Sequence, residues 1–220
     1  MGAGMSDHLY PNRRRVPLWL KVAYTVFMAV WVPSYWVAYG PTNFLYFCDI
    51  ALFVTLIALW KESPLLASAP AVGILIPQTL WCLDFFCGLF GYFPVGMTDY
   101  MFDSKIDLYY RSLSFFHVWL PFLLVYLVAR LGYDRRALRL WSVSAWSLLV
   151  ICYFWMPPPP APPQNPTLPV NINYVYGLRE DAPQTYMPPN VWFALLMAGM
   201  PVLIFLPTHW ILERWRGSRS

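Results

Sequence analysis

The chain has 220 residues, of which 59% are hydrophobic and 12% are charged, and its formal net charge is +4 at pH 7. A soluble domain carries about 25% charged and about 45–50% apolar residues, so this composition excludes a water-soluble monomer and a disordered chain. The 12 Trp, 15 Tyr and 15 Phe residues agree with this conclusion, because aromatic side chains concentrate at membrane interfaces. The composition therefore predicts a polytopic membrane protein.

A transmembrane helix needs about 20 apolar residues to cross a hydrocarbon core of about 30 Å. Six stretches of the sequence are continuously apolar over about this length, whereas a transmembrane β-strand would alternate between apolar and polar residues. We therefore predict an all-α protein with six transmembrane helices, the first of which is retained rather than cleaved as a signal sequence. The predicted spans are Pro17–Tyr39, Pro41–Trp60, Leu65–Phe90, Tyr109–Arg130, Leu140–Met156 and Asn190–Leu212.

The basic residues between the spans predict the orientation of the chain. If the connections alternate between two sides, eleven Lys or Arg residues fall on the side of the N-terminus and three on the other side. Because basic residues concentrate in cytoplasmic loops, we expect both termini in the cytoplasm and a multi-pass protein of the plasma (inner) membrane. The eleven are Arg13, Arg14, Arg15, Lys61, Arg130, Arg135, Arg136, Arg139, Arg214, Arg216 and Arg219, and the three are Lys105, Arg111 and Arg179.

This topology divides the chain into a basic cytoplasmic tail over residues 1–15, a single transmembrane domain over 16–212, and a cytoplasmic C-terminal tail over 213–220. The extracytoplasmic loop over residues 156–189 begins with MPPPPAPPQNPTLP. Proline fixes φ and has no N–H to donate, so this segment is predicted to be a polyproline II spacer.

Three of the ionisable residues in the predicted spans are the main candidates for a site, because such groups are costly in a membrane unless they are paired or functional. They are Asp49, Asp84 and His117. At a rise of about 1.5 Å per residue, Asp84 lies about 9 Å and His117 about 12 Å from the outer ends of their helices. Asn43 and, deeper in the membrane, Gln78 belong to the same outer half. The sequence thus predicts a polar layer shared by three helices.

Cys48 reaches this layer as well, at about 10 Å from the outer end of its span. A thiol and an imidazole at one depth can form a nucleophile–base pair, with a carboxylate such as Asp49 to orient the imidazole. The alternative is a structural pair in which Asp84 and His117 only hold helices together. Pro121 removes the N–H that would bond the carbonyl of His117, so a bend is expected there.

Metal and cofactor sites are not expected. Only one histidine lies in the polar layer, and the cysteines form no CxxC or Cys/His pattern. We predict free thiols at all four cysteines, which are Cys48, Cys82, Cys87 and Cys152.

Three short motifs resemble those of the YwaF-like bacterial integral membrane family. They are NFLYFCD at Asn43–Asp49, SFFHVWLP at Ser114–Pro121 and NINYVYG at Asn171–Gly177. In that group an animal relative is a cysteine-dependent phospholipid acyltransferase, and the more distant androgen-induced-gene lipid hydrolases use a threonine with a histidine. Bacterial members often carry a histidine two positions before the cysteine, where this chain has Tyr46.

The resemblance implies roles for individual residues. Cys48 matches the family cysteine and His117 the family histidine, while Asp49, Asn173 and Tyr174 match the other motif positions. It therefore implies a lipid acyltransferase or hydrolase that acts on membrane lipids.

Two other functions are compatible with the sequence. One is a non-catalytic membrane subunit or assembly protein, in which the buried polar residues are structural. The other is a small transporter or sensor, which is disfavoured because the inner half of the spans has few polar residues. No nucleic-acid partner is expected, because no basic domain lies outside the membrane. A homo-oligomer or a larger membrane complex is left open.

Overall fold

The computed structural model describes residues 16–179 and 182–216, so the predicted N-terminal tail and the end of the C-terminal tail lie outside the described residues. The described part is all-α, as predicted, and contains no β-strand. Its helices are α1 (Leu18–Tyr39), α2 (Phe47–Lys61), α3 (Pro64–Gly88), α4 (Leu108–Leu113), α5 (Phe116–Leu131), α6 (Arg136–Trp155), α7 (Pro189–Met200) and α8 (Leu206–Arg216). Three short 3-10 turns are η1 (Pro41–Leu45), η2 (Asp99–Met101) and η3 (Ile172–Tyr174), and a π-helical turn, η4 (Pro201–Phe205), joins α7 to α8.

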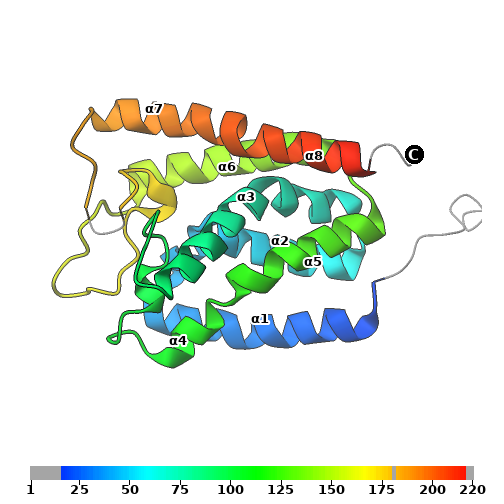
Figure 1. The fold of residues 1–220 in the computed structure, drawn as a ribbon, viewed down its shortest axis with the longest axis horizontal. Coiled ribbons are helices and arrows are strands. Elements are labelled where there is room, and N and C mark those ends of the chain that lie inside the picture. The colour runs from blue at the N-terminus through cyan, green and yellow to red at the C-terminus, as the bar shows by residue number, and fades with distance from the viewer. Residues whose placement is uncertain (1–15, 180–181, 217–220) are drawn as a thin grey trace, which may run out of the picture.

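Five helical segments are long and apolar enough to cross a membrane, which confirms the multi-pass character of the chain. They are Leu18–Tyr39, Pro64–Gly88, Leu108–Leu131, Arg136–Trp155 and Pro189–Arg216. In Figure 1, α1 begins and α8 ends at the same end of the bundle. A chain that crosses a membrane an even number of times has this arrangement. We call the end that holds these two helix termini the terminal end, and the opposite end, where the long loops gather, the loop end.

The second predicted span, Pro41–Trp60, is not one continuous helix. Its first part forms the 3-10 turn η1, and Tyr46 has an extended backbone with φ −62° and ψ 142°. The α-helical part, α2, has 15 residues and is about 22 Å long. The break is stabilised by the side chain of Asn43, whose Nδ2 donates to Asp49 Oδ2 at 2.8 Å across it.

The core is built around α3, which packs against α2, α5, α6 and α8. Figure 1 shows α3 in the middle of the bundle, with α1 along one edge and the α7–α8 segment along the other. Small residues on α3 let its neighbours approach closely. At Gly73 the indole ring of Trp141 on α6 occupies the space where any side chain would begin.

The predicted helix over 109–130 is divided into α4 and α5. The chain departs from a regular helix at Ser114, whose N–H is shared between the carbonyls of Tyr110 and Arg111. The Ser114 hydroxyl also contacts the Tyr35 hydroxyl of α1 at 2.7 Å, so a contact to another helix stabilises the irregular backbone.

The last predicted span, 190–212, continues to Arg216 and contains the π-helical turn η4. Pro201 and Pro207 each lack the N–H that would bond a carbonyl one turn earlier, and such gaps favour a local change of helical type. No residue of α7 is buried, as expected for a helix that faces lipid.

The loop between α6 and α7 is more than a spacer. Its second half folds back on the bundle, where Ile172 and Val175 join Leu149 and Cys152 of α6 in a small apolar cluster. This cluster positions the third family-like motif beside the start of α2.

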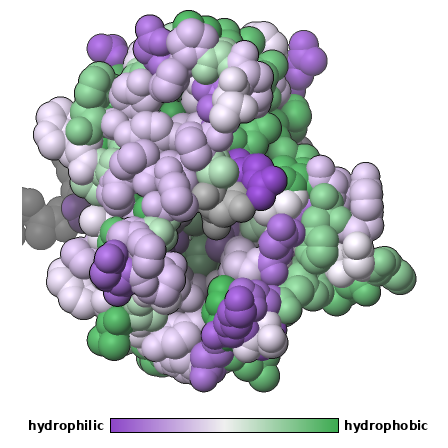
Figure 2. Space-filling view, turned by 90° about the vertical axis from the view of Figure 1, so that its left-hand side faces the viewer, coloured by the Kyte–Doolittle hydropathy of each residue, from purple (hydrophilic) through white to green (hydrophobic). Residues whose placement is uncertain are grey.

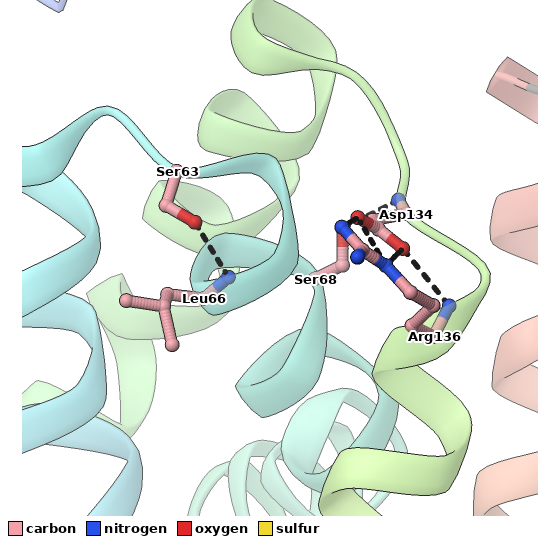
Figure 3. Close-up of polar contacts among 5 residues, drawn as sticks. All are labelled: Ser63, Leu66, Ser68, Asp134 and Arg136. Atoms are coloured by element: carbon pink, nitrogen blue, oxygen red, sulfur yellow. Dashed lines mark hydrogen bonds and ion pairs between the residues drawn. The ribbon is translucent and has the colours of Figure 1, made fainter.

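Side-chain caps organise the terminal end. The Ser63 hydroxyl accepts from the N–H of Leu66 at 3.4 Å and thereby caps α3. The N–H of Asp134 donates to the Ser68 hydroxyl at 3.1 Å, and the Asp134 carboxylate accepts from Arg136. Figure 3 shows how these contacts tie the turn between α5 and α6 to the first turns of α3.

Candidate functional site

The site begins at the first turn of α2, where the Asp49 carboxylate is buried. Its Oδ2 accepts from Asn43 at 2.8 Å, and its Oδ1 accepts from the Cys48 thiol, with the two atoms 3.5 Å apart. Cys48 itself is partly exposed. Asp49 was expected to orient the imidazole of His117, but the structure places its carboxylate against the thiol instead.

His117 lies in the first turn of α5. Its Nδ1 is 2.8 Å from the carbonyl oxygen of Ser114, and because a carbonyl can only accept, Nδ1 carries the proton in this contact. In the neutral ring the lone pair is therefore on Nε2, which can accept a proton. The ring is partly exposed and stacks on Trp81 of α3.

Pro121 of α5 has no N–H to donate to the carbonyl of His117. The carbonyl of His117, which loses its helical donor to the proline, accepts from the Cys82 thiol of α3 at 3.7 Å. This contact ties the backbone at His117 to the central helix.

Tyr35 of α1 contacts the His117 side of the site. Its hydroxyl is 2.7 Å from the Ser114 hydroxyl. Ser114 thus contacts Tyr35 through its side chain and His117 through its carbonyl. We call the set Tyr35, Cys48, Asp49, Ser114 and His117 the Cys–His cluster.

Sequence reasoning missed Tyr35 and Ser114 because their neutral hydroxyl groups carry no strong signal in an aromatic-rich span. One signal was available. Tyr35 lies four residues from the outer end of its span, at about 6 Å, and so at nearly the level of the predicted polar layer.

Asn173 brings the third motif to this region. Its Oδ1 accepts from the N–H of Phe47 at 2.9 Å, and its Nδ2 donates to the carbonyl of Leu45 at 2.9 Å. An amide side chain from a distant loop therefore caps the start of α2. The next residue, Tyr174, accepts at its carbonyl from the indole N–H of Trp192 at 2.9 Å.

Asp84 is fully buried, but it does not pair with His117 as the structural alternative proposed. Its two carboxylate oxygens accept from the N–H groups of Val95, Gly96 and Thr98 and from the Thr98 hydroxyl, at 2.7–3.1 Å. The carboxylate is thus engaged by the loop after α3. The contacts of Asp84 support a structural role, in which the carboxylate anchors a loop to α3 and does not pair with an imidazole.

Gln78 is also buried, two turns below Asp84 on α3, and its Oε1 has no hydrogen-bond partner among the described residues. All four cysteines are free thiols. Within residues 16–179 and 182–216, no group of three or more His, Cys, Asp or Glu side chains is placed to hold a metal ion.

The loop end is not flat. Figure 2 looks onto this end and shows a hollow near its centre, surrounded by side chains of mostly intermediate polarity. A depression of about 440 Å³ lies at the opposite, terminal end, between α1 and α2.

No model of a known protein family matches the chain, and neither the curated proteins nor the solved structures contain a significant match to it. The resemblance of three short motifs to the YwaF-like family therefore stays an expectation from the sequence. What the fold establishes is a helical, multi-pass membrane protein.

Proposed function

We propose that this protein is an integral membrane enzyme that transfers acyl groups between lipids or hydrolyses them, with Cys48 as nucleophile and His117 as base. The observation that carries the proposal is the Cys–His cluster, a polar group of side chains from three helices. Asp49 and Ser114 are buried in it, whereas Cys48 and His117 are partly exposed. Cys48 and His117 are thus less deeply buried than Asp49 and Ser114.

The proposed reaction has two steps. In the first, His117 Nε2 takes the thiol proton, the Cys48 sulfur attacks the ester carbonyl, and the carbon–oxygen bond breaks as the leaving alkoxide takes the proton from His117. In the second, a lysolipid hydroxyl or water gives its proton to Nε2 and attacks the thioester. The carbon–sulfur bond then breaks, and the thiolate recovers a proton from His117.

The hydrogen bonds of the cluster suit these steps. The carbonyl of Ser114 fixes the tautomer of His117, as a backbone or carboxylate acceptor does in other nucleophile–base pairs. Asp49 accepts from the Cys48 thiol and so holds it at the first turn of α2.

The orientation and the lipid substrate complete the proposal. The excess of basic residues at the terminal end supports a cytoplasmic location for both termini, in the plasma (inner) membrane. The Cys–His cluster then faces the outer leaflet, whose lipids are the proposed substrates. The three motifs shared with the YwaF-like family support the same chemistry.

A second candidate is a non-catalytic subunit or assembly protein. The contacts of Asn43, Asp84 and Asn173 favour it, because each of these side chains joins a loop or turn to a helix. In that case the Cys–His cluster serves only to stabilise the bundle.

Variants in lipid vesicles distinguish the two candidates. We expect Cys48→Ser and His117→Gln each to abolish most release or transfer of acyl chains, measured by mass spectrometry of the lipids, and the double variant to be little worse. Cys87→Ser and His209→Gln are the matched controls and should retain activity. Loss of activity that follows protein yield in all four variants supports the structural role and contradicts the enzymatic one.

A further inference from the structure

The depression at the terminal end has the size of a ligand site. Its volume is about 440 Å³, within the range of about 300–1,000 Å³ that is typical of small-molecule pockets. It lies between the start of α1 and the end of α2, far along the bundle from the Cys–His cluster. It is lined by Val16, Leu18, Lys21, Trp60, Lys61 and Glu62.

One cation of this site is held in place. Lys21 Nζ is 2.6 Å from Glu62 Oε1, which also accepts from the N–H of Val16 at 3.2 Å. The Lys21 ammonium group lies 5.8 Å from the centroid of the Trp60 ring. These contacts order the side chain, so little further conformational entropy is lost when it binds a ligand.

The second cation is uncommitted. Lys61, the last residue of α2, is exposed, and in the described part of the chain its ammonium group has no hydrogen bond or ion pair. The two lysines, Lys21 and Lys61, and the one glutamate, Glu62, give the residues that line the depression a net charge of +1. A ligand with a single negative charge neutralises it.

The same depression has an apolar wall. Leu18 is 65% exposed and Trp60 is 50% exposed, and tryptophan is enriched where a helix meets the lipid headgroups. Free phosphate would leave this wall uncovered, whereas the glycerol and upper acyl carbons of a lipid would cover it.

We propose that this depression binds an anionic glycerophospholipid of the leaflet at the terminal end. Lys61 and Lys21 contact the phosphodiester, and Trp60 and Leu18 pack against the glycerol backbone. This site is separate from the proposed acyl-transfer site and does not depend on it.

Native mass spectrometry of the detergent-solubilised protein tests the proposal, with phosphatidylglycerol and phosphatidylcholine as probes. A basic residue near an anionic lipid surface contributes about 1 kcal/mol, so Lys61→Ala should weaken phosphatidylglycerol binding about fivefold. Lys61→Arg should keep it. The matched control is Lys105→Ala, at another exposed lysine in the loop after α3, which should have no effect.

Three results would overturn the proposal. They are equal losses of phosphatidylglycerol in Lys61→Ala and Lys105→Ala, equal retention of phosphatidylcholine and phosphatidylglycerol by the unmodified chain, and displacement of the lipid by millimolar inorganic phosphate. The last of these would identify a phosphate site instead of a lipid site.

Discussion

The imidazole of His117 lies nearly flat against the indole of Trp81, with ring centroids 4.7 Å apart and planes inclined by 13°. Trp81 stacks on Phe85 in turn, at 5.4 Å and 5°, and Phe85 stacks on Phe102, at 5.5 Å and 29°. This column of rings runs from the Cys–His cluster to the loop that Asp84 anchors. The loop and the α3 rings thus fix the plane of the imidazole from one side.

Removing Trp81 should displace the imidazole of His117. We expect Trp81→Leu to lower acyl-transfer activity by up to about 100-fold, because a misplaced base loses its geometry with the nucleophile. The ring-proton resonances of His117 should move downfield as the shielding by the indole is lost. Trp155→Leu removes a 68% exposed tryptophan at the end of α6 and is the matched control, which should change neither quantity.

Asp84 should be essential for the order of the loop after α3. In Asp84→Ala, three N–H groups and one hydroxyl lose their acceptor, and each buried unsatisfied donor costs about 1–3 kcal/mol. We expect a large fall in the thermal unfolding midpoint and faster proteolytic cleavage between Gly91 and Phe102. Asp103→Ala, at an exposed position of the same loop, should leave both unchanged; equal effects of the two variants would contradict an anchoring role.

Gly73 should tolerate no side chain. A methyl group there would overlap ring atoms of Trp141, and overpacking of this kind typically costs about 1–3 kcal/mol. Gly199→Ala makes the same change on α7, where the nearest atom is Leu203 Cδ1 at 3.9 Å. The unfolding midpoint should therefore fall in Gly73→Ala and be maintained in Gly199→Ala. A midpoint unchanged in both would show that α3 and α6 do not pack as described.

Acid should weaken the turn between α5 and α6. The hydrogen bonds from Arg136 hold the pKa of the Asp134 carboxyl below its usual range. A carboxyl whose pKa is lower in the folded state adds stability above its unfolded pKa of about 3.9, and this contribution is lost as the pH falls through the folded pKa. We expect Asp134→Asn to have a lower unfolding midpoint than the unmodified chain at pH 7, with the difference shrinking below about pH 4. Because Arg136 is exposed, the effect at pH 7 should be small, about 1 kcal/mol or less. A difference that does not depend on pH would exclude this ion pair as its source.

The sequence predicted the helices better than their interruptions. Continuous apolar runs located every membrane-length segment, because hydrophobicity and helix length are both set by the bilayer. The breaks at Tyr46 and Ser114 were missed, since each depends on a tertiary contact, from Asn43 to Asp49 and from Ser114 to Tyr35. Such contacts leave no periodic pattern in the chain.

For the site, depth along each helix was predictable but rotation about each helix axis was not. The rise per residue correctly brought Cys48, Asp49 and His117 to the loop end of the bundle. It could not show that Asp84 turns toward a loop, because the partners of Asp84 are chiefly backbone N–H groups, which every non-proline residue has. For the same reason the Ser114 carbonyl that fixes His117 could not be identified from residue types.

The central claim is that Cys48 carries an acyl group during turnover. The most direct measurement is mass spectrometry of the protein after incubation with phospholipid vesicles and rapid acid quenching. We predict an acyl thioester on the peptide that contains Cys48, removable by neutral hydroxylamine and missing in His117→Gln, while Cys82, Cys87 and Cys152 stay unmodified. A chain that remains unacylated under conditions in which it is folded and vesicle-bound, or one that is acylated equally at all four cysteines, would contradict the account.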